Sequence, residues 1–373
     1  MDFSFTEEQE TVGKVARQLF EHRATPEVLT DLESGLKSGS VRHDQALWRE
    51  LASSDLLGIA LPESVGGSGG GFLELGVLLA EVGWSVAPVP VYATLLLGAD
   101  TIARHGNSAI QQRYLPTVAT GETILTAALA EPGNSDPTAP RTSARAAGDS
   151  WILDGSKELV PAAQLADAIV VSAQTDDGPR LFVIDTTADG VVVNPVSTTN
   201  GEPYADVEFA GALGHRLNGS GAEDAVGSLY TRALVGLCAL QVGVAERALG
   251  IAASYTTQRE QFGRPIGSFQ AVQQRLADAF IDVEAIRWTT WHAAWLISEG
   301  RPAGREAAIA KFWAAEAGAR VVASAQQVHG GMGIDVTYPL HRYFLWAKQI
   351  ELSLGSASQQ LARLGAAYPE GNK

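Results

Sequence analysis

The spacing of apolar residues predicts helices in the first third of the chain. Thr6-Glu7-Glu8-Gln9 is typical of a capping box at the start of a helix. The apolar positions that follow at helical spacing are Val12, Val15, Ala16, Leu19 and Phe20. We therefore predict a first helix with one buried face made of these five residues.

Three more helices are expected before residue 121. They run from Asp44 to about Ala52, with Leu47, Trp48 and Leu51 facing inward, from Phe72 to about Val82, and from Val91 to about His105. The segment 61–71 contains Pro62 and a run of glycines. We expect a loop there, because proline removes a backbone donor and glycine loses much conformational entropy in a helix.

The period changes after about Gly121, where short runs of β-branched or aromatic residues begin. These runs are 123–130, 151–153, 168–171, 181–184, 191–193 and 206–209. Asp154-Gly155, Asp177-Gly178 and Asp189-Gly190 separate several of them as turn signals, since both residue types tolerate positive φ. The pattern predicts a compact all-β domain of antiparallel hairpins over about 123–218, without strand–helix–strand units.

Helical spacing returns after Gly221 and continues to near Ala367. Breaks fall at Gly263–Ser268, Gly300–Pro302 and Gly330–Gly333, which favours a four-helix bundle. The stripe expected to face its core is Val272, Leu276, Ala279/Phe280, Val283 and Ile286/Arg287. The predicted fold class is therefore α+β. Its domains are an N-terminal all-α domain at 1–121, a middle β-barrel or sandwich domain at 122–220 and a C-terminal helical bundle at 221–373.

Charge and cysteine content exclude several classes of function. The 373 residues carry 27 Lys+Arg against 42 Asp+Glu, a formal charge of −15, and the basic residues do not cluster. We therefore expect no nucleic-acid partner and no anionic membrane partner. Cys238 is the only cysteine, so an intrachain disulfide and a multi-thiolate metal site are excluded. With neither a standard signal peptide nor an uncharged apolar run of membrane-span length, the chain is expected to be soluble and cytoplasmic.

Two segments of the C-terminal region carry candidate ligand-binding groups. In the first, Arg259, Phe262 and Gln270 flank a helix break at Gly263; arginine grips a diphosphate, phenylalanine lies against a flat ring, and glutamine bonds an adenine edge. In the second, Gln327 precedes a loop with glycine at 330, 331 and 333, which opens the backbone to a phosphate. Taken singly, each segment is equally compatible with an ordinary helix end.

Together, in this order and spacing, the two segments resemble the acyl-CoA dehydrogenase flavoprotein family, and the resemblance covers essentially the whole chain. The other matching segments are Pro62-Glu-Ser-Val-Gly-Gly67, Tyr114-Leu-Pro116, Glu131-Pro132, and Tyr338-Pro339 with Ala347-Lys348. The resemblance implies α,β-desaturation of an acyl-CoA. In this reaction a glutamate removes the α-proton, FAD takes the β-hydrogen as hydride, and electron-transfer flavoprotein usually reoxidises the flavin.

The resemblance also implies that each FAD is held by two subunits. One subunit holds the flavin ring and supplies the base, while the bundle of its neighbour holds the ADP half. The residues that match the ADP-holding half are all present here: Arg259, Phe262, Gln270, Gln327, Gly330 and Gly331.

The ring-holding half departs from the family pattern. Ala130 replaces a threonine whose hydroxyl bonds the ring, although Ser135 is retained, and Pro161 stands where a strand residue donates to the flavin edge. Leu354 occupies the usual position of the catalytic glutamate, and Ala233 occupies the alternative position used by a minority of members. We therefore predict no catalytic base and no metal site in this chain.

Three carboxylates close to these positions in the sequence are candidates to replace the missing base. Glu351 lies three residues before Leu354 and is interpreted as a solvated charge, because such a shift moves a carboxylate several Å away. Glu158 lies beside the altered strand, and Glu131 is interpreted as part of the Glu-Pro turn shared by the family. His329 and His341 are expected to pack or face solvent, and Cys238 is expected to be a buried small apolar residue on a bundle helix.

The favoured hypothesis is a non-catalytic subunit that completes the FAD site of a homologous sister chain. It resembles such subunits in the actinobacterial heterotetrameric (α2β2) dehydrogenases that shorten steroid side chains attached to CoA, with the acyl-CoA bound mainly by the partner. The alternatives are a self-sufficient homotetrameric dehydrogenase with a relocated base, and a flavin-free scaffold or binding protein of the same fold. The acyl group, the electron acceptor and the contents of the vestigial site are left open.

Overall fold

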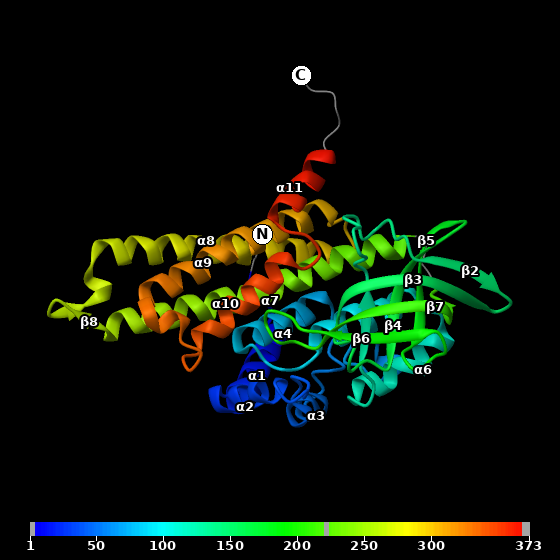
Figure 1. The fold of residues 1–373 in the computed structure, drawn as a ribbon, viewed down its shortest axis with the longest axis horizontal. Coiled ribbons are helices and arrows are strands. Elements are labelled where there is room, and N and C mark those ends of the chain that lie inside the picture. The colour runs from blue at the N-terminus through cyan, green and yellow to red at the C-terminus, as the bar shows by residue number, and fades with distance from the viewer. Residues whose placement is uncertain (1–3, 220–223, 368–373) are drawn as a thin grey trace, which may run out of the picture. The chain divides into compact units, whose positions relative to one another are not determined.

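The computed structural model describes residues 4–219 and 224–367, which pack as two compact units (Figure 1). The first unit contains the chain up to Leu19, Glu27–Leu75 and Pro88–Ala233. The second contains Phe20–Pro26, Gly76–Ala87 and the chain from Leu234 onwards. The division into three domains at residues 121 and 220 stays a prediction.

The helices before residue 120 are α1 (Glu7–Arg23), α2 (Pro26–Leu36), α3 (Gln45–Ser53), α4 (Phe72–Ser85), the π-helix η2 (Tyr92–Asp100), α5 (Thr101–His105) and α6 (Ser108–Ala119). The predicted capping box is confirmed, since the backbone N–H of Thr6 donates to the Gln9 side chain and that of Gln9 donates to the Thr6 hydroxyl. Val12, Ala16 and Phe20 are buried, as predicted. Val15 is 37% exposed, so the prediction that it belongs to the buried face is wrong. The α2 helix was not predicted.

A single seven-stranded sheet follows. Its strands are β1 (Leu125–Ala128), β2 (Ser143–Ala147), β3 (Ser150–Pro161), β4 (Ala168–Thr175), β5 (Gly178–Asp185), β6 (Val191–Val196) and β7 (Tyr204–Arg216). They lie in the order β1-β4-β2-β3-β7-β5, with β6 also paired to β7. The core under the sheet is built from inward-facing residues such as Leu153, Ile169, Phe182 and Val207.

Three details of the predicted β region are corrected. The sheet is not made of antiparallel hairpins alone, because β1 runs parallel to β4, with Leu125 opposite Ala168. Asp154-Gly155 is not a turn: it lies inside β3 at a register shift, where a Cβ on Gly155 would come within 2.8 Å of the Thr142 Cα. The strand β2 was missed. Asp177-Gly178, in contrast, does form the turn between β4 and β5, with Gly178 at a φ of 99°.

The second unit contains most of α7 (Ala225–Gln258) with α8 (Gln270–Ser298), α9 (Gly304–His329), α10 (Leu340–Leu352) and α11 (Ala357–Ala366). At the predicted break between α7 and α8, a short hairpin forms from β8 (Glu260–Gln261) and β9 (Arg264–Pro265), and the 3-10 turn η4 (Ile266–Ser268) follows it. The break after α9 contains the 3-10 turn η5 (Gly330–Ile334). Ala279, Val283 and Ile286 of the predicted stripe are buried, whereas Phe280 is 56% exposed and does not face the core.

Two glycines let α4 and α7 cross at backbone contact. A Cβ on Gly243 would lie 1.9 Å from the Ala80 carbonyl oxygen, and a Cβ on Gly83 would lie 2.0 Å from the Leu240 carbonyl oxygen. Any side chain at either position would force the helices apart. The crossing explains why these helix-disfavouring residues lie inside long helices.

Within residues 4–219 and 224–367, one helix, α7, is long and apolar enough to cross a membrane by length and composition alone. Of its most apolar window, 72% is buried inside the protein. Burial in the packed core accounts for its apolar character.

Candidate cofactor-binding site

The hairpin after α7 presents the first candidate segment. Arg259 follows the last residue of α7, and its carbonyl accepts the N–H of Ile266 at 2.8 Å, which closes the base of the hairpin. Phe262 and Gly263, at the tip, have φ values of 53° and 77°. Two consecutive residues with positive φ are typical of the tight two-residue turns that connect twisted antiparallel strands. The turn holds the Phe262 ring in solvent, 92% exposed.

Aromatic contacts stiffen this hairpin. The Phe262 ring meets the edge of the Phe269 ring at a centroid distance of 6.2 Å, and the Arg264 guanidinium lies 4.3 Å above the Phe269 ring. Phe269 immediately precedes Gln270, the first residue of α8. Arg259, Phe262 and Gln270 are therefore exposed side chains on one small, braced element.

The second candidate segment lies at the end of α9. The helix stops at Gly330, whose φ of 59° and ψ of −133° strain any residue with a Cβ. Nothing lies within 4 Å of a Cβ built on Gly330 or Gly331, whereas a Cβ on Gly333 would strike the Gln326 carbonyl oxygen at 2.6 Å. The first two glycines thus leave an open backbone surface that a phosphate can approach, while Gly333 is needed for packing.

A cluster of three rings joins the two segments. The rings of Tyr255, in the last turn of α7, and His329, at the end of α9, stack at 4.2 Å, and Tyr338 lies 5.1 Å from His329. The His329 Nδ1–H donates to the Ala325 carbonyl at 2.7 Å, and its Nε2 accepts from the Tyr338 hydroxyl at 3.2 Å. Burial lowers the pKa of His329, so the ring is neutral at pH 7.

The cluster therefore places Arg259 and the Gly330-Gly331 loop at the same end of the bundle. His329 was predicted to pack or to face solvent, and it packs. From the sequence, Tyr338 was named only within a matching segment, and the ring contacts through which Tyr255 and Tyr338 connect the two segments were missed. Their only signal was that each aromatic residue lies within a few residues of a helix end.

Apart from Leu354, the residues that match the ring-holding half lie in the first unit, and the matching Glu-Pro segment there contains a buried carboxylate. Glu131 is 3% exposed and accepts hydrogen bonds from Lys157 Nζ at 2.8 Å and from the backbone N–H groups of Arg141 and Thr142. Burial alone would raise the pKa of Glu131, but these donors outweigh it and lower the pKa to about 2. A carboxylate held this firmly in its charged form is a structural anion and not a proton acceptor.

The altered end of β3 offers no side-chain donor. Leu159 is at a φ of 50° with its side chain 49% exposed, and its N–H donates to Asp206 Oδ1 at 2.9 Å. Pro161 has no N–H, and its carbonyl accepts from the Thr126 hydroxyl. Ala130, by sequence, has no hydroxyl either. Ala130 and Pro161 therefore lack the donors that the resemblance implies for contacts to a flavin ring.

Both expected base positions are held by apolar side chains in well-fixed backbone. Leu354 lies between α10 and α11 at a φ of 53°. The buried Lys311 fixes the preceding turn by donating to the carbonyls of Glu351 at 3.1 Å and Gly355 at 2.9 Å. Ala233 is fully buried within α7, and its carbonyl accepts from the Tyr92 hydroxyl.

The interpretation of Glu351 as a solvated charge was wrong. Its side chain is only 22% exposed and pairs with Lys348 at 2.5 Å, one turn earlier on α10. The pairing was visible in sequence, because residues three apart on a helix are neighbours. The correction leaves Glu351 less available as a base, since its carboxylate is already engaged.

No group of three or more His, Cys, Asp or Glu side chains with metal-binding geometry occurs within residues 4–219 and 224–367. Cys238 is buried, and burial raises the pKa of its thiol to about 12. The thiol is therefore neutral and packs as a small apolar group, as predicted.

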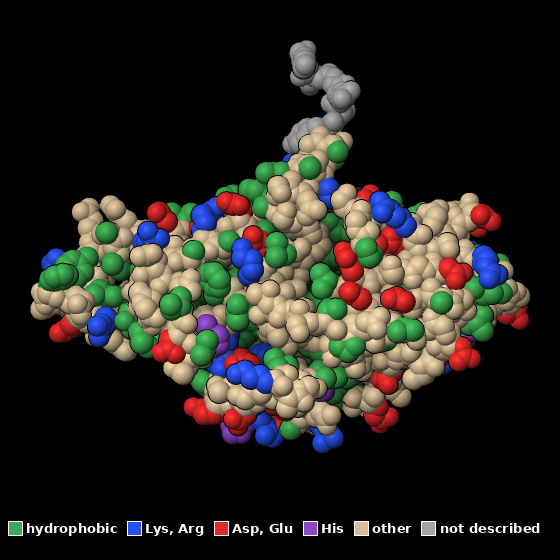
Figure 2. Space-filling model, viewed as in Figure 1, with side chains coloured by type: hydrophobic (Ala, Val, Ile, Leu, Met, Phe, Trp, Pro, Cys, Tyr) green, Lys and Arg blue, Asp and Glu red, His purple; other side chains and the backbone are tan. Residues whose placement is uncertain are grey.

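Exposed apolar side chains are concentrated in the second unit. Those on helices are Phe280, Ile281, Trp288, Leu352 and Leu361, and those near the glycine loop are Met332, Ile334 and Val336. Figure 2 shows hydrophobic side chains scattered among polar ones on the visible face, some of them where Figure 1 labels β8. Exposed apolar residues in such numbers are typical of a surface that another protein covers.

Known proteins match this chain along its whole length. The acyl-CoA dehydrogenase N-terminal, middle and C-terminal domains match residues 6–122, 126–211 and 219–368. Acyl-CoA dehydrogenase FadE27 of Mycobacterium tuberculosis is 39% identical, with 99% of each chain covered.

Solved structures agree with these matches. The ChsE4-ChsE5 complex of Mycobacterium tuberculosis contains a chain that is 39% identical, with a TM-score of 0.92 and coverage of 99% of this chain and 100% of that one. A variant of the Tcur3481-Tcur3483 steroid ACAD is 44% identical, with a TM-score of 0.91 and coverage of 96% and 97%. The protein belongs to the acyl-CoA dehydrogenase family.

Proposed function

We propose that this chain is a subunit of an FAD-dependent acyl-CoA dehydrogenase that has lost its own active site and completes the FAD site of a homologous sister subunit. One contrast carries the proposal. The exposed surface of Arg259, Phe262 and the Gly330-Gly331 backbone is intact and open, whereas both base positions, Leu354 and Ala233, are apolar. The isolated chain is then inactive.

FAD is the cofactor of this family and, when bound, accepts the β-hydrogen of the acyl-CoA as hydride. The exposed residues here fit its ADP half. Arg259 offers a guanidinium for the diphosphate, Phe262 offers an unburied ring face, and Gln270 and Gln327 offer amides. The open backbone at Gly330-Gly331 admits close approach of the ligand. None of these groups performs proton transfer, so their role is to bind and orient.

The names of the relatives support a heteromeric assembly acting on a steroid thioester. One similar structure is the ChsE4-ChsE5 complex, and another, the Tcur3481-Tcur3483 steroid ACAD, carries two protein names. We extend this to an α2β2 assembly in which the sister supplies the glutamate and most of the acyl pocket. Electron-transfer flavoprotein is the proposed acceptor and the cytoplasm the proposed location. The apolar residues exposed on α8 suit a buried subunit contact.

Each alternative function meets a specific obstacle in the structure. A self-sufficient dehydrogenase would need a relocated base, but Glu351 is paired with Lys348 and Glu131 with Lys157. A flavin-free scaffold would not need a 92% exposed Phe262 on a strained turn, because exposing a large ring contributes nothing to folding.

Restoring the glutamate alone is expected not to restore a second active site. In a complex with the sister subunit, Leu354→Glu should leave the acyl-CoA dehydrogenation rate per complex unchanged, because Ala130 and Pro161 still lack the donors for a flavin ring. Leu354→Gln is the matched control, being similar in size and unable to act as a base. A rate and flavin content that double in Leu354→Glu, but not in Leu354→Gln, would refute the proposed loss of the ring site.

A further inference from the structure

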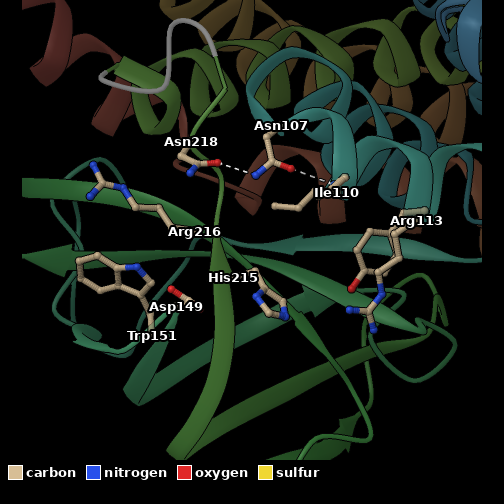
Figure 3. A pocket seen from close by; sticks show the side chains of 10 residues that line it. Asn107, Ile110, Arg113, Asp149, Trp151, His215, Arg216 and Asn218 are labelled. Atoms are coloured by element: carbon tan, nitrogen blue, oxygen red, sulfur yellow. Dashed lines mark hydrogen bonds between the residues drawn. The ribbon is translucent and has the colours of Figure 1, made fainter.

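A cavity of about 490 Å³ lies within the first unit, between α6 and the sheet (Figure 3). The N-terminal half of α6 forms one wall with Ile110 and Tyr114, and the start of β3 and the end of β7 form the other with Trp151 and Arg216. Its volume is in the range of small-molecule sites. None of its lining residues matches the family positions discussed above for FAD or the base.

Of the two arginines that line this cavity, Arg216 is the one without a close carboxylate partner. Its guanidinium lies 5.5 Å over the Trp151 ring, its side chain is 26% exposed, and its nearest carboxylate, Asp177, is 3.9 Å away, beyond hydrogen-bond distance. The guanidinium therefore keeps donors that a ligand oxygen in the cavity can engage. Arg113, in contrast, is engaged with Asp185 at 2.5 Å.

An amide pair places a further donor beside the cavity. The Asn107 Oδ1 accepts the Ile110 N–H as the N-cap of α6, while its Nδ2 donates to Asn218 Oδ1 at 2.8 Å. Because the carbonyl oxygen of Asn218 is used in this bond, its NH₂ group is the part left to donate outward. The N-terminal end of α6 adds a partial positive charge to the same wall.

The remaining lining groups define what the rest of the ligand must be. Asp149 supplies a carboxylate that accepts hydrogen bonds from hydroxyl groups, and Ile110, Ala109 and Tyr114 supply an apolar wall. A free phosphate ion would fill only a small part of about 490 Å³. A phosphate, a polyhydroxylated sugar and a flat ring together match the donors, the acceptor and the wall.

We propose that this cavity binds a nucleoside monophosphate, with the phosphate on Arg216 and Asn218 and the ribose hydroxyls on Asp149. No lining residue of the cavity belongs to the candidate FAD surface, so this proposal does not rest on the proposed subunit role.

The test is titration of the full-length chain with AMP in a calorimeter. Arg216→Ala should weaken AMP binding by about 10- to 100-fold, the loss expected for a charged hydrogen bond. Asn218→Ala should weaken it by a smaller factor. In an Arg259→Ala background, which weakens the ADP-holding surface, Arg216→Ala should still weaken AMP binding by the same factor, which separates the two sites. Circular dichroism of each variant checks that the fold is retained.

Adenosine and inorganic phosphate serve as the two partial ligands. Both should bind at least about 10-fold more weakly than AMP, because each lacks one half of the recognised groups. The proposal is overturned if AMP does not bind, if adenosine or phosphate binds as tightly as AMP, or if binding is lost in Arg259→Ala and kept in Arg216→Ala.

Discussion

Replacing Arg259 by Ala is expected to strip most of the FAD from a complex of this chain with its sister subunit. Arg259 is exposed at the base of the hairpin, and within residues 4–219 and 224–367 it makes no side-chain ion pair. A charged hydrogen bond contributes about 1.5–3 kcal/mol. The affinity for FAD should therefore fall by roughly 10- to 100-fold, measured as flavin absorbance per protein after gel filtration.

The matched control is Arg264→Ala on the same hairpin. Arg264 lies over the Phe269 ring and is not part of the proposed diphosphate contact. If the hairpin acts only by its shape or charge, both variants should lose flavin equally. Full flavin content in Arg259→Ala would contradict the proposed role of this surface.

Lys157→Met is expected to give the largest loss of stability of any single substitution discussed. Lys157 is fully buried, and its Nζ donates to Glu131 Oε1 at 2.8 Å and to Ser172 Oγ at 2.9 Å. Removing the lysine leaves the Glu131 carboxylate charged and buried. Breaking one side of a buried ion pair costs about 3–5 kcal/mol. The measurement is the free energy of unfolding from urea denaturation.

Two further variants make this prediction specific. The double variant Lys157→Met/Glu131→Gln should recover a large part of the loss, because no unpaired charge is left inside the sheet. Lys14→Met, which removes an exposed pair with Glu10 on α1, should change the free energy of unfolding by less than about 1 kcal/mol. Equal losses in Lys157→Met and Lys14→Met would show that the buried pair is not structural.

The sequence predicted those parts of the fold that depend on local pattern. The capping box of α1, the helix α3 behind Asp44 and the turn at Asp177-Gly178 follow from residues within a few positions of each other. The α2 helix and β2 were missed. The latter, Ser143–Ala147, contains no β-branched or aromatic residue and forms by pairing with β3.

Pairings between distant segments could not be read from the sequence. The parallel register of β1 on β4 joins Leu125 to Ala168 across the intervening β2 and β3. The π-helix η2 is another case, because a Cβ on Gly98 would lie 2.3 Å from the Leu125 Cβ, so β1 packs directly against that turn. Such contacts appear only when the chain has folded.

The candidate site was predicted as a set of residues but not as a geometry. Arg259, Phe262 and the glycine loop were predicted to bind a ligand from their chemistry and from the resemblance to the family's ADP-holding half. The positive φ at Phe262 gave no signal, because Phe-Gly is not a usual turn pair. The pairing of Glu131 with Lys157, 26 residues away, also could not be predicted from the sequence. It shows that Glu131 is a buried anion as well as part of the Glu-Pro turn.

The most direct test of the central claim is the flavin content of the chain made alone and made together with its sister subunit. We predict that the chain alone is colourless and shows no acyl-CoA-dependent bleaching. The co-purified complex should contain one FAD for every two chains and should be active. A yellow single chain whose flavin is bleached by acyl-CoA would contradict the account, because Leu354, Ala233 and Pro161 would then belong to a working active site.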